Sequence, residues 1–154
     1  TIDNHYPFYI ETRSGLHGKP FKIIKLKTMK NNKTVTKLGR YLRLFKIDEL
    51  TQILNVCLGQ MSLVGPRPLY LEYNDKYSEM EKIRLNAKPG ITGLAQIKLN
   101  NNDDWRSKFK YDVFYVKNKS LKFDFYILCE TFSFYFKILL GKKIIKENHK
   151  KFGY

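Results

Sequence analysis

The chain has 154 residues, the size of one ordinary domain, and 43% of them are hydrophobic, which is enough for a core. Charged residues make up 28% and the mean hydropathy is −0.44, values that exclude a membrane-helix bundle and a disordered tail. Lys and Arg outnumber Asp and Glu by 29 to 14, so the formal net charge is +15 and the expected partners are polyanions: nucleic acid, anionic lipid headgroups or phosphorylated small molecules.

The basic excess lies in the two ends of the chain. Residues 1–47 hold 11 basic and 2 acidic groups, a net charge of +9, and residues 105–154 hold 12 and 4, a net charge of +8. Residues 48–104 hold 6 basic and 8 acidic groups, a net charge of −2. Most of the carboxylates therefore lie in a nearly neutral centre between two basic flanks.

Short runs of β-forming residues flank a turn with Gly15 and Gly18, which predicts a β-hairpin over about residues 8–27. Helical spacing begins at Thr36, a residue that can cap a helix, and continues to about residue 45. After a short break, a second helix is predicted from residue 48 to about residue 58, where a glycine ends it.

Two prolines exclude regular helix from residues 62–68. The mixed charge of residues 69–84 favours a solvated helix, and residues 88–98 read as a loop that enters a short strand. A helix with aromatics on one side is predicted over residues 105–116. The pattern as a whole predicts an α+β domain, in which several short helices surround a small antiparallel sheet formed by the hairpin.

Residues 121–140 predict an amphipathic helix that is rich in aromatics, and a basic tail follows over about residues 142–154. The apolar stripe consists of Leu121, Phe125, Leu128, Phe132, Phe136 and Leu139. Such a helix either covers a core or lies in a membrane interface, and the spacing leaves both open. Cys57 and Cys129 lie among apolar residues without a CxxC partner, which predicts buried free thiols in a reducing compartment.

The candidate chemistry centres on Asp48 and Glu49, which open the second helix, where the helix dipole favours negative charge. Asp48 alone could be a simple N-cap. The preceding helix, however, brings Arg40 and Arg43 to the same corner, and Arg67 lies between two prolines that restrict its backbone. A carboxylate, a rigid guanidinium and a Gly-punctuated loop together suit phosphoryl chemistry with a divalent cation.

At this point the sequence resembles a known family, the bacterial sugar transferases, which are small monotopic polyprenyl-phosphate phosphoglycosyltransferases. The matching segments run in family order and span most of the chain. They are R-S-G-L-H-G-K-P-F at 13–21, K-L-K-T-M at 25–29, T-K-L-G-R-Y-L-R at 36–43, I-D-E-L-T-Q-I-L-N-V at 47–56, G-Q-M-S-L-V-G-P-R-P at 59–68, K-P-G-I-T-G-L-A-Q at 88–96, K-F-K-Y-D-V-F-Y-V at 108–116 and S-L-K-F-D at 120–124.

The resemblance implies transfer of a sugar 1-phosphate from a UDP-sugar to a polyprenyl phosphate such as undecaprenyl phosphate, at the cytoplasmic face of the bacterial inner membrane, which starts assembly of a surface glycan. It implies that Asp48 is the nucleophile of a phosphosugar intermediate, with Mg²⁺ held near it and Glu49 as its partner. Arg67 and Arg43, with Arg40 nearby, would bind phosphate. The loop with Gly90, Thr92, Gly93 and Gln96 would approach the nucleotide, and an anionic membrane surface would be a further partner.

The chain departs from the family pattern at a few positions. Thr51 stands where Pro is usual, Leu94 where Trp is usual, and Lys27 and Asn100 where Arg is usual. The apolar re-entrant helix with which family members usually begin is not seen, so the sequence indicates a soluble-domain fragment or a truncated homologue. Two alternatives stay open. One is a catalytically degenerate relative that binds a nucleotide sugar or a partner. The other is a basic nucleic-acid-binding module, although the sequence contains no recognisable nucleic-acid-binding motif.

Overall fold

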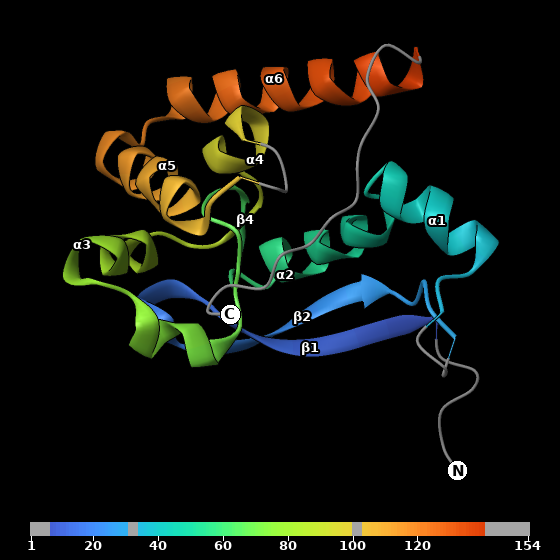
Figure 1. The fold of residues 1–154 in the computed structure, drawn as a ribbon, viewed down its shortest axis with the longest axis horizontal. Helices are drawn as coiled ribbons and strands as arrows, with labels where there is room; N and C mark the ends of the chain where they lie inside the picture. The colour runs from blue at the N-terminus through green and yellow to red at the C-terminus, as the bar shows by residue number, and fades with distance from the viewer. Residues whose placement is uncertain (1–6, 31–33, 100–102, 141–154) are drawn as a thin grey trace.

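The computed structural model describes residues 7–30, 34–99 and 103–140, which form two small sheets and the helices around them (Figure 1). The strands are β1 (Phe8–Ser14), β2 (Pro20–Leu26), β3 (Ser62–Val64) and β4 (Gly90–Thr92). The α-helices are α1 (Lys37–Leu44), α2 (Ile53–Cys57), α3 (Glu79–Lys82), α4 (Leu94–Lys98), α5 (Trp105–Asn118) and α6 (Leu121–Leu139). The 3-10 helices are η1 (Leu16–Gly18), η2 (Ile47–Gln52), η3 (Leu71–Lys76) and η4 (Ile83–Asn86).

Strands β1 and β2 form the predicted antiparallel hairpin, the long pair of arrows at the bottom of Figure 1. Phe8 pairs with Leu26 and Ser14 with Pro20, so the hairpin agrees with the predicted range to within a residue. In β2, buried Phe21 and Ile23 alternate with exposed Lys22. This side of the hairpin faces η2 and α2 and therefore supports the segment that carries the candidate carboxylates.

A second sheet, which is not predicted from the sequence, consists of β3 and β4 in parallel, with Ser62 opposite Gly90 and Val64 opposite Thr92. The crossover between them holds η3, α3 and η4. The predicted continuous helix over residues 69–84 is wrong, because the chain is extended at Tyr77 and Ser78 starts a new helix with a capping box closed by Glu81.

The predicted pair of helices around residues 36–58 is present, with one change at the second. Thr36 caps α1, as its hydroxyl accepts a hydrogen bond from the Gly39 backbone at 2.8 Å. Lys46 then adopts a left-handed backbone with φ 56° and ends the first helix. The second begins as the 3-10 helix η2 with Lys46 as its N-cap, so Asp48 is not an N-cap but a side chain of the first turn.

Helices α5 and α6 complete the core above the parallel pair. Three clusters of buried side chains hold the layers together. They are Val64 with Leu94, Tyr115 and Ile127; Leu69 with Tyr73, Tyr77 and Phe109; and Phe21 with Ile23 and Met61. Phe109 and Tyr115 of α5 thus face inward, whereas Tyr111 and Phe114 are exposed. The α+β class expected from the sequence is confirmed.

Helix α6 buries Ile127 and Ile138, whereas most of its predicted apolar stripe faces outward. The exposed members are Leu121, Phe125, Phe132, Phe136 and Leu139, and Leu128 is half-buried. The helix therefore covers the core with one side and presents an aromatic surface with the other. In the described ranges, no helix combines the length and the apolarity that crossing a membrane requires.

The prediction that Cys57 and Cys129 are buried is wrong: both are exposed free thiols. Cys57 ends α2, and Leu54 in this helix and Leu58 directly after it are themselves exposed. Cys129 lies on the exposed outer side of α6. Apolar neighbours in sequence did not indicate burial because these helices present apolar side chains to solvent.

Candidate active site

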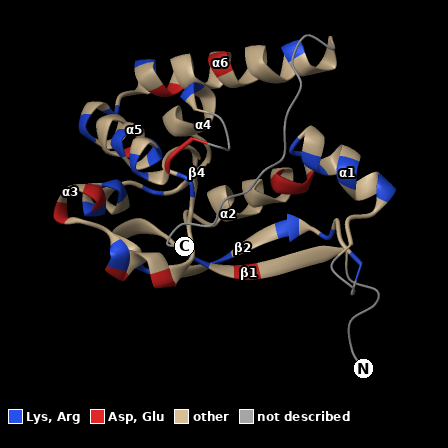
Figure 2. Ribbon diagram, in the orientation of Figure 1, with Lys and Arg blue, Asp and Glu red and all other residues tan. Residues whose placement is uncertain are grey.

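The carboxylates Asp48 and Glu49 are both buried in the first turn of η2, with exposed fractions of 9% and 6%. The acidic turn lies directly beside the basic helix α1 (Figure 2). Two adjacent buried carboxylates repel each other, and each needs a cation or a proton in a site of low polarity. The two residues meet this requirement in different ways.

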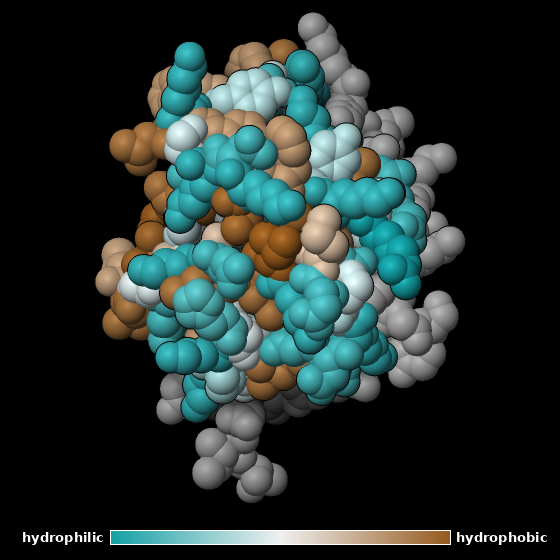
Figure 3. Space-filling model, turned by 90° about the vertical axis from the view of Figure 1, so that its left-hand side faces the viewer, coloured by the Kyte–Doolittle hydropathy of each residue, from teal (hydrophilic) through white to brown (hydrophobic). Residues whose placement is uncertain are grey.

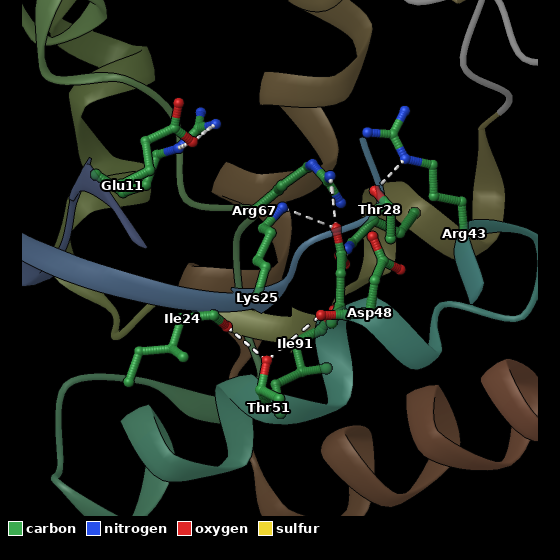
Figure 4. A network of polar contacts seen from close by, with 12 residues as sticks. Glu11, Ile24, Lys25, Thr28, Arg43, Asp48, Thr51, Arg67 and Ile91 are labelled. Atoms are coloured by element: carbon green, nitrogen blue, oxygen red, sulfur yellow. Dashed lines mark hydrogen bonds and ion pairs between the residues drawn. The ribbon is translucent and has the colours of Figure 1, made fainter. Parts of the chain in front are cut away.

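Glu49 is paired with two cations. Its Oε1 accepts hydrogen bonds from Lys25 Nζ at 3.1 Å and from Arg67 Nη2 at 3.2 Å. Burial by itself would raise the pKa of Glu49, but the charges of Arg67, Lys25 and Lys46 outweigh it and hold that pKa well below its usual range. Glu49 is therefore ionised at neutral pH and binds both cations at one oxygen. Figure 4 shows the ends of the Lys25 and Arg67 side chains pointing toward the same place.

Asp48 has no such partner. Its Oδ1 is fully buried, and the structure gives it no hydrogen bond. Burial and the neighbouring charge of Glu49 raise the pKa of Asp48, and Lys46, Lys25 and Arg43 only partly offset them. In Figure 4 the Asp48 side chain lies between the Arg67 side of the site and the Thr28–Arg43 side. An unsatisfied buried carboxylate oxygen of this kind is costly for stability and available for chemistry.

Arg67 is held as the sequence predicts. The flanking Pro66 and Pro68 are both buried, and the Arg67 side chain is about one-third exposed, at 37%. Its guanidinium reaches Glu49 from the segment that follows β3. The structure thus brings together the proline-flanked arginine and the acidic turn, which are 18 residues apart in the chain.

The two arginines of α1 differ in their placement. Arg43 is half-buried and donates from Nε to Thr28 Oγ1 at 2.8 Å, and its charge partly offsets the raised pKa of Asp48. Arg40 is exposed, and within residues 7–30, 34–99 and 103–140 no hydrogen bond or ion pair joins its side chain to the carboxylates. Of the predicted phosphate-binding residues, Arg67 and Arg43 are at the site, whereas Arg40 is not.

The glycines of the predicted nucleotide loop are required by the chain itself. A Cβ on Gly90 would lie 2.1 Å from the backbone nitrogen of Gly65, and one on Gly93 would lie 2.2 Å from the Gly65 oxygen. Their contact with a nucleotide stays a prediction. Thr92 points elsewhere, since its hydroxyl bonds with that of Thr131 on α6 at 2.8 Å.

Gln96 carries the second unsatisfied buried oxygen of the described chain, Oε1. Its amide nitrogen donates to the Ile91 carbonyl at 3.3 Å, which holds the side chain against β4. A small pocket beside this strand is lined by Gly90, Glu49 and three cations, Arg13, Lys25 and Arg67. It opens on the Glu49 side of the carboxylate pair and is suited to an anionic group.

A divalent cation is compatible with these residues. Mg²⁺ prefers oxygen ligands and commonly takes one or two carboxylates together with substrate phosphates and water. The unsatisfied Oδ1 of Asp48 supplies such an oxygen. No group of three or more His, Cys, Asp or Glu able to hold a metal occurs among the described residues, so a dedicated protein cage is not what these side chains form.

Sequence reasoning missed several residues of the site. Lys25 lies in the K-L-K-T-M segment, but the sequence does not single it out, because a lysine on a strand has no distinguishing pattern. Tyr135 comes from α6, and its pKa is raised to about 12, mainly by burial. The charges of Glu49 and Asp48 add to this increase, and the charge of Arg67 opposes it. Arg84 and Asp112 form a buried ion pair at 2.9 Å, which no local spacing indicates.

The family-divergent positions have ordinary structural roles where they are described. Thr51 donates from its hydroxyl to the Ile24 carbonyl at 2.9 Å and so ties η2 to β2. Leu94 is buried in the core, and Lys27 is exposed. Asn100 lies outside the described residues.

Comparisons with known proteins agree with the sequence motifs. A family model described as bacterial sugar transferase matches residues 1–138. The uncharacterized sugar transferase EpsL of Bacillus subtilis is 44% identical over 153 residues, which cover 92% of this chain and 74% of that protein.

Two further relatives carry names that state a reaction. The UDP-glucose:undecaprenyl-phosphate glucose-1-phosphate transferase of Caulobacter vibrioides is 39% identical over 142 residues, which cover 79% of this chain and 53% of the relative. The undecaprenyl-phosphate galactose phosphotransferase of Salmonella typhimurium is 34% identical over 159 residues, which cover 85% of this chain and 33% of the relative. The chain thus spans about half and one third of the length of these two relatives.

Proposed function

This chain belongs to the bacterial sugar transferase family, and we propose that it transfers a sugar 1-phosphate from a UDP-sugar to undecaprenyl phosphate. The observation that carries the proposal is the contrast within the carboxylate pair. Glu49 is neutralised by Lys25 and Arg67, whereas buried Asp48 keeps an oxygen without a partner. A carboxylate in that state is suited to attack phosphorus.

In the first half-reaction, Asp48 attacks the phosphorus that carries the sugar. A bond forms between the carboxylate oxygen and this phosphorus, and the bond to the bridging oxygen of the diphosphate breaks. UMP leaves with that oxygen and its electron pair. In the second half-reaction, an oxygen of the lipid phosphate attacks the same phosphorus, the acyl phosphate bond breaks, and Asp48 is free again.

The neighbouring charges address the main difficulty, which is repulsion between a carboxylate and an anionic diphosphate. Arg67 and Lys25 lie on the Glu49 side and Arg43 on the opposite side, so positive charge flanks Asp48. Removing one preorganised contact to the charge that develops in the transition state typically costs about 10²–10³-fold in rate. Glu49 holds Arg67 and Lys25 in place for this purpose.

Asp48 would also hold Mg²⁺ through its unsatisfied oxygen. When bound, the ion supplies positive charge that neutralises diphosphate oxygens. Because Glu49 Oε1 is already engaged by two side chains, Asp48 is the residue of the pair to which we assign the ion.

We further propose that the outer side of α6 lies against an anionic membrane, at the cytoplasmic face of the bacterial inner membrane, where the product would start a surface glycan. The exposed stripe from Leu121 to Leu139 is apolar, and Lys122 and Lys137 mark its two ends. By contrast, the face that carries α3 and α5 is mainly hydrophilic, with a smaller hydrophobic area at its centre (Figure 3). An apolar helix side with flanking lysines suits an interfacial position.

Intact mass of the protein tests the proposed reaction. The chain is incubated with UDP-glucose or UDP-galactose and Mg²⁺, without lipid acceptor, and compared with Asp48→Asn. We expect a mass increase of one hexose phosphate and release of UMP with the wild type alone. UDP binding without UMP release would instead identify a degenerate relative, and equal masses for both proteins with every UDP-sugar would reject the aspartyl intermediate.

A further inference from the structure

Arg84, in η4, is a charged side chain that the proposed reaction does not use, although it is only 3% exposed. Burying a guanidinium is expensive unless its donors are satisfied. Its partners therefore indicate what this residue does in the structure.

The guanidinium of Arg84 bonds in three directions. Nε and Nη2 donate to Asp112 Oδ2 at 3.1 and 2.9 Å, and Nη1 donates to the Tyr77 hydroxyl at 3.0 Å. Nη2 also donates to the main-chain carbonyl of Arg67 at 2.7 Å. The rings of Tyr77 and Phe109 lie 5.3 Å from the guanidinium carbon. Arg84 is thus fixed by its surroundings and holds one backbone oxygen of the arginine at the site.

The other end of the same segment is held from the same helix. Tyr115, three residues after Asp112 on α5, donates to the Val64 carbonyl at 3.2 Å and to Asp124 Oδ1 at 2.7 Å. Helix α5 therefore holds both ends of the segment between Val64 and Arg67. Tyr115 bonds the Val64 carbonyl directly, and Asp112 reaches the Arg67 carbonyl through Arg84.

The middle of the segment is bonded to β4. The Gly65 nitrogen donates to the Thr92 carbonyl at 2.9 Å, and the Gly90 nitrogen donates to the Pro66 carbonyl at 3.0 Å. Four consecutive residues thus have a fixed backbone, and the side chain that leaves it toward solvent and Glu49 is that of Arg67.

We propose that Arg84, oriented by Asp112, is a positioning residue that holds Arg67 where its guanidinium meets the substrate diphosphate. The inference rests on the proposed function for the identity of the ligand, and it adds residues that touch neither substrate nor Asp48. A displacement of about 1 Å at a reacting group can cost about 10²-fold in rate, so a rigid anchor behind Arg67 has a direct effect on the chemistry.

A double-mutant cycle with Arg84→Lys and Arg67→Ala tests the proposal, read as kcat/KM for sugar-phosphate transfer. Lysine keeps the charge but lacks the fork that reaches both Asp112 and the carbonyl. We expect Arg84→Lys to lower kcat/KM by about 10–100-fold in the wild type and by less than about 2-fold in the Arg67→Ala background. An equal loss in both backgrounds, or no loss in the wild type, would overturn the proposal.

A control separates positioning from general packing. Tyr77→Phe removes the hydroxyl that accepts from Nη1 and leaves the bonds of Arg84 to Asp112 and Arg67, so we expect nearly unchanged activity despite some loss of stability. An activity loss in Tyr77→Phe as large as that in Arg84→Lys would count against the proposal. If Arg84→Lys does not fold by circular dichroism, Asp112→Asn carries the same cycle with the same expected outcomes.

A binding measurement separates this inference from the proposed reaction. Calorimetric titration with UDP or inorganic pyrophosphate needs no turnover, and we expect the same non-additivity in Kd. A chain that binds the diphosphate with the expected coupling but transfers no sugar phosphate would reject the reaction and retain the positioning role. Transfer with additive losses would retain the reaction and reject the positioning role.

Discussion

Asp48 and Glu49 are adjacent in the chain, yet Lys25 and Arg67 both bond Glu49, at 3.1 and 3.2 Å, and neither bonds Asp48. The pKa values of the two carboxyls consequently shift in opposite directions, up for Asp48 and down for Glu49. This division gives each residue its own expected behaviour on substitution.

Asp48→Asn is expected to stabilise the protein while it removes the proposed nucleophile. The substitution eliminates a buried charge without a hydrogen-bond partner on Oδ1, so the free energy of unfolding should rise by about 0.5–1 kcal/mol. Urea denaturation at pH 7 without Mg²⁺ measures it. Asp104→Asn, at the cap of α5, is the control and should change little because Asn caps as well as Asp. A loss above about 1 kcal/mol in Asp48→Asn would contradict the expectation.

Glu49→Gln is expected to destabilise the protein at pH 7 by about 1–3 kcal/mol, since it leaves Lys25 and Arg67 without their shared anion but partly open to solvent. Because the pKa of Glu49 is lowered by folding, its ionised side chain stabilises the protein fully above pH 4.5, the ordinary pKa of a glutamate. This stabilisation is lost as the pH falls through the folded-state pKa. The difference between wild type and variant should therefore shrink below about pH 4.5.

Urea denaturation across pH measures this difference. Glu79→Gln, which breaks an exposed pair with Lys82, is the matched control and should cost less than about 0.5 kcal/mol at any pH. A Glu49→Gln deficit that stays constant from pH 7 to pH 3, or a deficit no larger than that of the control, would show that the ion pairs do not contribute in this way.

Gly90→Ala is expected to disrupt the parallel β3–β4 pair. The added Cβ would meet two backbone atoms, the Gly65 nitrogen at 2.1 Å and the Thr92 oxygen at 2.4 Å, so the loss of stability should be about 3 kcal/mol or more. Gly59→Ala, where φ is +73° and the atom nearest to the added Cβ is Lys88 Nζ at 3.8 Å, should cost only about 1 kcal/mol through backbone strain. Thermal unfolding compares them, and equal losses would refute the steric argument.

Substitution of Phe132 and Phe136 by Ser together is expected to weaken binding to vesicles with anionic phospholipid. Their side chains are 78% and 62% exposed on the outer side of α6, so the double variant should bind at least about 10-fold more weakly in sedimentation assays. Met80→Ser removes a side chain of similar exposure, 62%, from α3 and should leave binding unchanged. Equal binding by all three proteins would place the membrane surface elsewhere.

Local patterns predicted the elements whose signals are local. The hairpin follows from β-forming runs around a glycine turn, and α1 from apolar spacing behind the Thr36 cap. The helix expected over residues 69–84 failed because composition does not reveal where Ser78 closes a capping box and restarts the helix. The β3–β4 pairing joins residues nearly thirty positions apart, and its strands of three residues are too short to show a period.

The same distinction holds at the site. Adjacent acids and a proline-flanked arginine are visible in sequence, and the structure brings Glu49 and Arg67 into contact. In the sequence, Arg40 and Arg43 are equivalent members of one basic stripe, but in the structure only Arg43 bonds Thr28 beside the site. Arg84 and Asp112 were missed because a buried ion pair between distant segments has the same residue types as any solvated surface.

The two sides of the site are anchored very unequally. Behind Arg67, α5 fixes the backbone through Tyr115 and through Arg84. On the opposite side, α1 buries only Gly39, and its bonds to Thr28 come from Arg43 and from the cap residue Thr36. Weakly packed elements open at a lower free-energy cost than the core. A bound substrate would therefore contact a rigid side at Arg67 and a more mobile side at α1. We expect closure around the substrate to come from α1, which should show faster amide hydrogen exchange than α5.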